Sequence, residues 1–226
     1  MISVYTFTLG RWKYLNKCLQ ASEGDAFDFI GDIEHIVCFQ GVRPSFEVRN
    51  RFDPVKHEYW ETNVGIAEGM NKILPKLKGD IIIKMDEDCV IRSPEFYTHV
   101  REVSKLVPNA VFSPYPVGLI RNPGGVPANG PHKVVYSDRL DTYYTLRPVD
   151  HVGGFCRVSP GFTKEWKFQP DLGLKGASGN EDTQFSGRCK QERIPMYYLE
   201  NTLIVEHQES TLGQHERYKE YFKDRF

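Results

Sequence analysis

The sequence predicts an α/β fold in which helices flank a mostly parallel central sheet. Short β-rich segments alternate with helical patterns over residues 1–92, and such strand–helix–strand alternation places successive strands parallel in one sheet. The length of 226 residues fits one generous domain or two cramped ones. The sequence contains no internal repeat or low-complexity tract, so repeat architectures are not expected.

The first strand and the first helix are expected within the opening 25 residues. β-Branched and aromatic residues dominate Ile2–Thr8, which predicts a strand that ends before Gly10. The residues that follow at helical spacing are Leu15, Cys18, Leu19 and Ser22. This spacing predicts a helix, after which Ile33–Phe39 forms a second strand.

A second helix is expected over Val64–Leu77, followed by a buried strand. The apolar face of this helix consists of Ile66, Met70, Ile73, Leu74 and Leu77. Because Pro75 lies inside the pattern, we expect the helix to kink or end near Leu74. Gly79 then leads into the strand Asp80–Met85.

The second half of the chain has a different pattern. Proline or glycine occupies ten of the 24 positions in 108–131, which predicts a functional or mobile segment without regular structure. The remaining elements expected are strands at His151–Val158 and Met196–Val205, a helix near Glu181–Glu192, and a short charged helix at Gln214–Phe226 that packs on the body of the protein.

Composition and charge exclude several classes of protein. Hydrophobic residues make up 40% of the chain and charged residues 26%, which excludes disordered, collagen-like and disulfide-scaffold proteins. The net charge of −1 argues against a strongly basic surface, so a nucleic-acid partner is not favoured, although it stays among the alternatives.

The five cysteines are scattered, odd in number and without a Cys-x-x-Cys pair. Residues 1–10 lack the basic start and apolar core of a signal peptide, and no apolar run approaches the roughly 18 residues of a membrane span. These features predict reduced thiols in a soluble, cytoplasmic protein without a transmembrane segment.

The strongest local signal is the acidic run Asp86-Glu87-Asp88, which directly follows the buried strand. Ligands of parallel sheets bind beyond the carboxyl ends of the strands. In extended backbone Asp86 and Asp88 point to the same side, and two converging carboxylates require a cation such as Mg²⁺ or Mn²⁺. The alternative is an acidic turn before a helix that starts at Ser93-Pro94-Glu95.

A second acidic signal, Glu181-Asp182, follows the glycine-rich stretch Gly173–Gly179 and opens the third predicted helix. One of these carboxylates is a candidate general base toward an incoming hydroxyl. The alternative is simple stabilisation, because carboxylates in the first turn favour a helix.

Two further side chains suit the same chemistry. His207 follows a strand and could supply a third metal ligand as a neutral imidazole, or it could merely be hydrogen-bonded. Arg11, at the end of the first strand, suits a diphosphate beside a helix N-terminus, or it could be a surface arginine. Among the other histidines, His151 is the one of interest.

Taken in order, these pieces resemble the inverting, family-2-like GT-A glycosyltransferases. The opening strand and helix look like that group's first βα unit, and Asn63-x-Gly65-x-Ala67-x-Gly69-x-Asn71 resembles its helix entry. Asp86-Glu87-Asp88 matches the DxD motif, and Glu181-Asp182 matches the pair whose aspartate is the catalytic base. His207 lies where several members have a metal-binding histidine.

The resemblance implies a single Rossmann-like GT-A domain over residues 1–226. Residues 1–92 would bind the nucleotide-sugar, and residues 93–226 would form the acceptor and catalytic half. The implied activity is metal-dependent transfer of a sugar, with inversion, from a nucleotide-diphosphate donor (a UDP-sugar by first expectation) to a hydroxyl of a glycan or other acceptor. Mn²⁺ or Mg²⁺ is the implied cofactor.

The resemblance also assigns roles to residues. Asp182 would be the base beside Glu181, and the metal ligands would be Asp88, Asp86 and His207. The residues implied to bind the nucleotide-sugar are Thr6, Thr8, Arg11, Gln40, Asn63, Asn71, Asp86 and Gly154. The chain departs from the family's pattern at Cys38-Phe39-Gln40-Gly41, where an aspartate commonly reads uracil, and at Met70, where an arginine is frequent.

Three alternatives to this activity stay open at the level of sequence. Asp86-x-Asp88 also looks like the nucleophile motif of haloacid-dehalogenase-type phosphatases, although that motif normally lies near the N-terminus. A nucleotidyltransferase would require a glycine-rich loop that Thr6–Arg11 lacks. A non-catalytic module that binds nucleotide-sugars is the third alternative. The acceptor could be a glycan, a lipid-linked sugar, a protein side chain or a modified nucleic-acid base.

Overall fold

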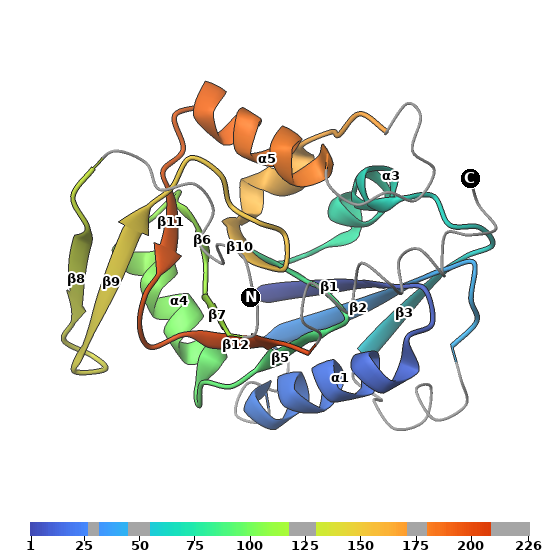
Figure 1. Cartoon of the computed structure of the whole chain (residues 1–226), viewed down its shortest axis with the longest axis horizontal. Coiled ribbons are helices and arrows are strands. Elements are labelled where there is room, and N and C mark those ends of the chain that lie inside the picture. Colours follow the sequence, from blue (N-terminus) through green and yellow to red (C-terminus); the bar gives the residue numbers. More distant parts are fainter. Residues whose placement is uncertain (27–31, 45–54, 118–129, 171–179, 209–226) are drawn as a thin grey trace.

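A computed structural model describes residues 1–26, 32–44, 55–117, 130–170 and 180–208. Within these ranges it contains a nine-stranded sheet in the order β3-β2-β1-β4-β10-β6-β11-β9-β8 and a three-stranded sheet in the order β5-β12-β7 (Figure 1). The predicted α/β class is confirmed. In the large sheet, the strands from the first half of the chain (β1 to β4) are all parallel. The strands from the second half pair in both parallel and antiparallel directions.

The first half forms the parallel part of the sheet. Its strands are β1 (Ile2–Thr8), β2 (Ile33–Gln40), β3 (Val55–Trp60) and β4 (Ile81–Met85). Its helices are α1 (Trp12–Ala26) and α3 (Ile66–Ile73), the latter continued by the 3₁₀ turn Leu74–Lys76. The predicted strands and helices are therefore present, and the α-helix ends before Leu74 as Pro75 requires. Strand β3 was not predicted.

The second half adds mixed strands and two helices. The elements are β5 (Cys89–Ile91), α4 (Phe96–Leu106), β6 (Val111–Ser113), β7 (Tyr115–Val117), β8 (Lys133–Ser137), β9 (Thr142–Pro148), β10 (Cys156–Pro160), the 3₁₀ helix Gly161–Glu165, α5 (Asn180–Gln191), β11 (Met196–Leu199) and β12 (Ile204–His207). Strand β10 lies antiparallel to β4, with Cys156 opposite Met85. This pairing brings the residues before β10 to the end of β4.

Several expectations for the second half were wrong in detail. The segment predicted as the strand His151–Val158 is a strand only from Cys156 onward. The predicted strand Met196–Val205 is two strands in different sheets, separated by a turn in which Thr202 has a φ of 73°. Strands β6 and β7 lie in the proline-rich segment, and the β8–β9 hairpin was missed. The glycine-rich stretch 173–179, the rest of the proline-rich segment (118–129) and the predicted C-terminal helix (214–226) lie outside the described residues.

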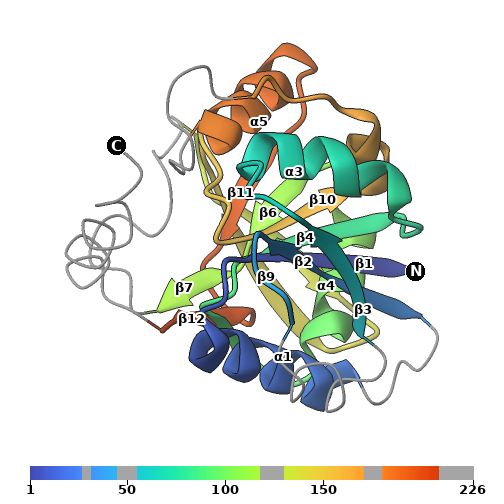
Figure 2. The same cartoon turned by 90° about the vertical axis from the view of Figure 1, so that its right-hand side faces the viewer.

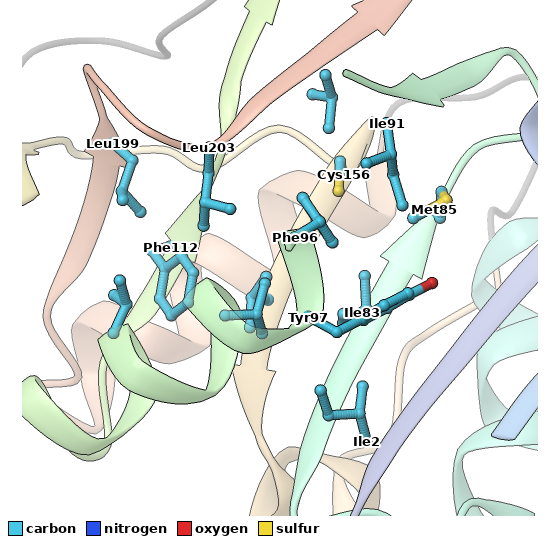
Figure 3. Close-up of a cluster of buried hydrophobic side chains, with 14 of the residues drawn as sticks. Ile2, Ile83, Met85, Ile91, Phe96, Tyr97, Phe112, Cys156, Leu199 and Leu203 are labelled. Atoms are coloured by element: carbon cyan, nitrogen blue, oxygen red, sulfur yellow. The ribbon is translucent and has the colours of Figure 1, made fainter. Parts of the chain in front are cut away.

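Helices cover both faces of the large sheet (Figure 2). Side chains of α4 pack with Ile2, Val4 and Ile83 on one face, where Figure 3 shows the cluster around Phe96, Tyr97 and Phe112. Side chains of α3 and α5 pack with Ile82 on the other face. Both faces of β4 are thus buried, which explains its uninterrupted run of isoleucines.

Candidate active site

The acidic run lies at the carboxyl edge of the parallel strands, in the turn that joins β4 to β5. The backbone N–H of Cys89 donates to the carbonyl oxygen of Asp86 at 3.0 Å, so the run is a tight turn and not the extended segment that we expected. In this turn Asp86 contacts Lys84, whereas Glu87 and Asp88 both contact Arg11.

Asp86 is tied to a buried lysine. The ammonium group of Lys84 donates to Asp86 Oδ1 at 2.9 Å and to the carbonyl oxygen of Gly154 at 2.8 Å. The Lys84 side chain is 3% exposed, whereas that of Asp86 is 39% exposed. The protein around the Asp86 carboxylate displaces much of its water and raises its pKa to about 6; Lys84 opposes this effect and Asp88 adds to it.

Asp182 is held at the same place from the first turn of α5. Its Oδ2 accepts the backbone N–H of Gly154 at 2.7 Å, and its Oδ1 accepts Nη1 of Arg157 at 2.8 Å. Although burial alone would raise the pKa of Asp182, the positive charges of Lys84 and Arg157 hold it below its usual value. Asp182 is therefore a carboxylate near neutral pH.

Gly154 brings the two halves of this arrangement together. Its N–H contacts Asp182, its carbonyl oxygen contacts Lys84, and the next residue, Phe155, accepts the Asp86 N–H at 2.9 Å. A Cβ atom on Gly154 would lie 2.3 Å from Asp182 Oδ1 and 2.5 Å from Lys84 Nζ. Only glycine allows the backbone to pass this close to both side chains.

Asp88 lies beside His207, the other predicted metal ligand. His207 Nε2 is 3.5 Å from Asp88 Oδ2, and Nη2 of Arg11 donates to the same oxygen at 3.0 Å. The antiparallel pairing of β5 with β12 creates this proximity, because it places His207 opposite Cys89. The carbonyl oxygen of Asp88 also accepts the N–H of Gln208 at 2.9 Å.

Glu87 is a buried partner of the first strand's end. It accepts a hydrogen bond from the hydroxyl of Thr8 and another from Nε of Arg11 at 2.6 Å. Burial raises the pKa of Glu87, against the effect of Arg11. Arg11 therefore bridges Glu87 and Asp88 and compensates part of their negative charge, which is a more specific role than that of a surface arginine.

The donor set for a metal ion is only partly assembled. In the described ranges, no group of three or more histidine, cysteine, aspartate or glutamate side chains is arranged to hold an ion. Asp88 and His207 nevertheless provide a carboxylate oxygen and an imidazole nitrogen side by side; the carboxylate suits Mn²⁺ or Mg²⁺, and imidazole is a ligand typical of transition-metal ions. Asp86, the third predicted ligand, is directed to Lys84.

The other predicted nucleotide-binding residues hold the loops around the site. Gln40 Oε1 accepts the N–H of Val64 at 3.1 Å, and Asn63 Oδ1 accepts the N–H of Gly65 at 2.9 Å, so both lie at the carboxyl ends of β2 and β3. Two residues lie elsewhere. Thr6 is fully buried with its hydroxyl 3.0 Å from His35 Nε2, and Asn71 makes a two-point contact with the backbone of Phe168.

Sequence reasoning missed Lys84 and Arg157. Both are charged residues inside strands that are otherwise buried, and this placement was a usable signal because a buried charge requires a partner. Glu181, beside Asp182, is 2% exposed, and its negative charge helps to raise the pKa of Lys84 against the effect of burial.

The structure also bears on the predictions about the cysteines and about membrane-spanning helices. All five cysteines are buried with free thiols. No helix in the described part of the chain is both long enough and apolar enough to cross a membrane.

The sequence matches no protein-family model, and no curated protein matches it. Solved structures do match it. GalNAc-T7 with UDP, GalNAc and Mn²⁺ superposes with a TM-score of 0.66 at 15% identity over 97% of this chain and 47% of that one. S. aureus TarS 1–349 in complex with UDP-GlcNAc gives 0.63 at 16% identity over 91% of this chain and 57% of that one.

A third similar structure is the mannosyltransferase PcManGT from Pyrobaculum calidifontis in complex with GDP-Man and Mn²⁺. It superposes with a TM-score of 0.66 at 11% identity over 96% of this chain and 59% of that one. The chain therefore has the GT-A fold of glycosyltransferases, as the sequence motifs predicted. It spans about half the length of the proteins that it matches.

Proposed function

We propose that the chain is a metal-dependent, inverting glycosyltransferase that moves a sugar from a nucleotide-diphosphate donor to a hydroxyl of a glycan or other acceptor. One observation carries the proposal: on a GT-A fold, the carboxylate of Asp182 and the acidic turn at Asp86 meet at one sheet edge through Gly154 and Lys84. A base and a site for the donor's diphosphate are thereby adjacent.

The donor is proposed to bind across the carboxyl ends of β1, β2 and β4. Arg11 and Thr8 end the first strand, Gln40 and Asn63 border the next two strands, and Asp86 is the most exposed acid of the turn. UDP is our first expectation for the carrier. Because the similar structures include both UDP and GDP-mannose complexes, uridine and guanosine donors should be assayed side by side.

Asp88 and His207 are proposed to hold the metal ion, with Asp86 as the further ligand that the sequence motif suggests. When bound, Mn²⁺ or Mg²⁺ would neutralise the negative charge that develops on the leaving diphosphate. Divalent ions at such sites commonly have only one or two carboxylate ligands and complete their shell with substrate phosphates and water. A donor set with two adjacent protein ligands is compatible with that pattern.

Asp182 is proposed as the general base. Its lowered pKa keeps it ionised, and each of its oxygens retains a lone pair beyond the one used for Gly154 or Arg157. It would accept the proton of the acceptor hydroxyl as the oxygen attacks the anomeric carbon. A single displacement would invert the configuration. Glu181 would support the base by keeping Lys84 charged.

Residues 93–226, which carry Asp182, are proposed to shape the acceptor site. The acceptor's chemistry stays open, and the nucleic-acid alternative remains the least favoured on the basis of net charge. Five buried free thiols support a reducing, cytoplasmic location for the protein.

The experiment that tests the proposal is a binding and turnover screen. Purified protein is heated with UDP- and GDP-sugars, with and without Mn²⁺, and a donor at 100 times its Kd should stabilise it by about 2.7 kcal/mol. The donor found is then incubated with candidate acceptors, and the anomer formed is read by NMR. A flat thermal response, or a product that retains its configuration, would contradict the proposal. Binding without turnover would favour the non-catalytic module, and phosphate release from simple phosphoesters would favour the phosphatase.

A further inference from the structure

A buried arginine, Arg157, lies in the middle of β10 directly behind the proposed base. Its side chain is 1% exposed, and in the sheet register it lies opposite another buried cation, Lys84. Two neighbouring buried cations are unfavourable unless anions and hydrogen bonds compensate them. Asp86 compensates Lys84 and Asp182 compensates Arg157, so each buried cation is paired with one acid of the candidate site.

Arg157 contacts α5 at two residues that lie one turn apart. Its Nη1 donates to Asp182 Oδ1 at 2.8 Å, and its guanidinium carbon lies 3.7 Å from the centre of the Phe185 ring. Residues three apart lie on the same face of a helix, so the Asp182 carboxylate and the Phe185 ring contact the planar guanidinium from the same side of α5. Arg157 thus contacts both the Asp182 carboxylate and the side chain one turn further along α5.

The second Asp182 oxygen is fixed independently. It accepts the N–H of Gly154, and one turn further along α5 the hydroxyl of Ser186 accepts the N–H of Val152 at 3.1 Å. The carboxylate is therefore held at both oxygens by donors from one continuous segment, residues 152–157. Within the described residues, Nη2 of Arg157 has no hydrogen-bond partner, and the guanidinium also lies close enough to the Tyr5 hydroxyl to lower the pKa of that group against the larger effect of burial.

We propose that Arg157 is a positioning residue, which orients the Asp182 carboxylate toward the acceptor hydroxyl by seating its guanidinium between that carboxylate and the Phe185 ring. The inference rests on the proposed function, in which Asp182 is the base. A lysine could supply the charge but not the planar contact with the ring or the fixed direction of the N–H. The role of Arg157 is therefore in the geometry of the reaction and not in donor binding.

The test compares kcat and KM in Arg157→Lys and Arg157→Met. A small misplacement of a reacting group can cost about 100-fold in rate, so we expect kcat to fall by about that factor in both variants. The KM for the donor, and the donor-induced thermal shift with Mn²⁺, should stay at wild-type values because no donor contact is removed. The matched control is Arg188→Met, which removes a partly exposed arginine of α5 from Trp166 and Glu192, not from Asp182, and should leave kcat unchanged.

A folded Arg157→Lys variant with wild-type kcat would overturn the inference, as would equal losses in donor binding and turnover. If the Arg157 variants do not fold, Phe185→Leu serves instead, since it keeps the ion pair and removes the ring. A smaller fall in kcat at constant donor KM is then expected, and an unchanged kcat would overturn the inference. Failure of the proposed function is distinguishable, because the wild-type protein itself would then show no transfer.

Discussion

His207 Nε2 lies 3.5 Å from Asp88 Oδ2, and this pair joins two segments more than a hundred residues apart in the chain. Neither residue is near the surface, with side chains 6% and 3% exposed. The same carboxylate oxygen accepts a hydrogen bond from Arg11. The positive charge of Arg11 thus already compensates the buried Asp88 carboxylate beside His207. A divalent ion bound to Asp88 would compete with Arg11 for the same oxygen.

This relationship predicts opposite effects for two substitutions on metal binding. His207→Gln should weaken Mn²⁺ binding by about 100-fold, because it removes one of the two adjacent side chains that we propose as ligands. Arg11→Met should strengthen Mn²⁺ binding to the nucleotide-free protein, because it removes a competing positive charge. Titration of free Mn²⁺ by electron paramagnetic resonance measures both affinities without any need for turnover.

The control for the metal experiment is Arg92→Met, which removes an exposed guanidinium from Glu206, the neighbour of His207. Its Mn²⁺ affinity should equal that of the wild type. Equal Mn²⁺ affinity in the wild type and the His207 variant would mean that the ion, if it binds, lies elsewhere.

Asp182→Asn tests whether Asp182 is the general base, as we propose. The amide keeps the shape of the side chain but cannot accept a proton, so kcat should fall by about 10²–10⁴-fold while the donor still raises the melting temperature. Asp150→Asn provides the matched control, since Asp150 is a half-exposed acid paired only loosely with Lys190 at 3.7 Å. Near-normal turnover in the Asp182 variant would assign the base elsewhere.

Gly154→Ala tests the close approach of the backbone to the charged groups. The added methyl group would lie 2.3 Å from Asp182 Oδ1 and 2.5 Å from Lys84 Nζ, so one of these groups must move. We expect a loss of about 1–3 kcal/mol in stability, measured by urea unfolding, together with a large loss of turnover.

Gly187→Ala is the matched control for this substitution. Gly187 lies within α5, and the space that a Cβ atom would occupy there is open, so alanine should be neutral or stabilise the protein by up to about 1 kcal/mol. Equal stabilities for the two variants would contradict the packing described around Gly154.

The first half of the fold was predictable because its local signals agree with its tertiary structure. The isoleucine run of β4 is buried on both faces, and the helical spacing of Leu15, Cys18 and Leu19 corresponds to fully buried positions of α1. Pro75 ended the α-helix where its missing N–H requires.

The second half was less predictable because its strands are short and pair with distant partners. Strand β10 has five residues and joins β4 and β6 in antiparallel fashion, a pairing that periodicity cannot reveal. The β8–β9 hairpin did carry a sequence signal in its β-branched and aromatic residues. Two of them, Tyr136 and Tyr143, form a cross-strand pair with ring centres 4.6 Å apart.

In the candidate site the acids and Arg11 were predictable from the sequence, whereas the buried cations Lys84 and Arg157 were not. The position of a carboxylate after a strand indicates the sheet edge, which identified Asp86 and Asp88. Whether a polar residue near that edge faces a ligand or the body depends on its neighbours. The side chains of Thr6 and Asn71 point into the protein, where Thr6 is hydrogen-bonded to His35 and Asn71 to the backbone of Phe168.

His35 makes the stability of the fold depend on pH. It is buried between Thr6 and Ser22, and burial lowers its pKa from 6.5 to about 4. Below pH 6.5 the His35 imidazole takes up a proton in the unfolded chain, whereas in the folded protein it does so only near pH 4. The free energy of unfolding therefore falls as the pH drops from 6.5 to about 4. Across the whole window, a pKa shift of this size corresponds to a loss of about 3 kcal/mol in the free energy of unfolding.

His35→Gln should remove this part of the acid sensitivity. Glutamine retains hydrogen-bonding groups for Thr6 and Ser22 but cannot take up a proton, so its variant should lose less stability than the wild type between pH 7 and pH 4.5. Urea unfolding at both pH values measures the difference, and other titrating groups cancel because they are common to both proteins. An identical loss in wild type and His35→Gln would show that burial does not lower the pKa of His35 in the folded protein.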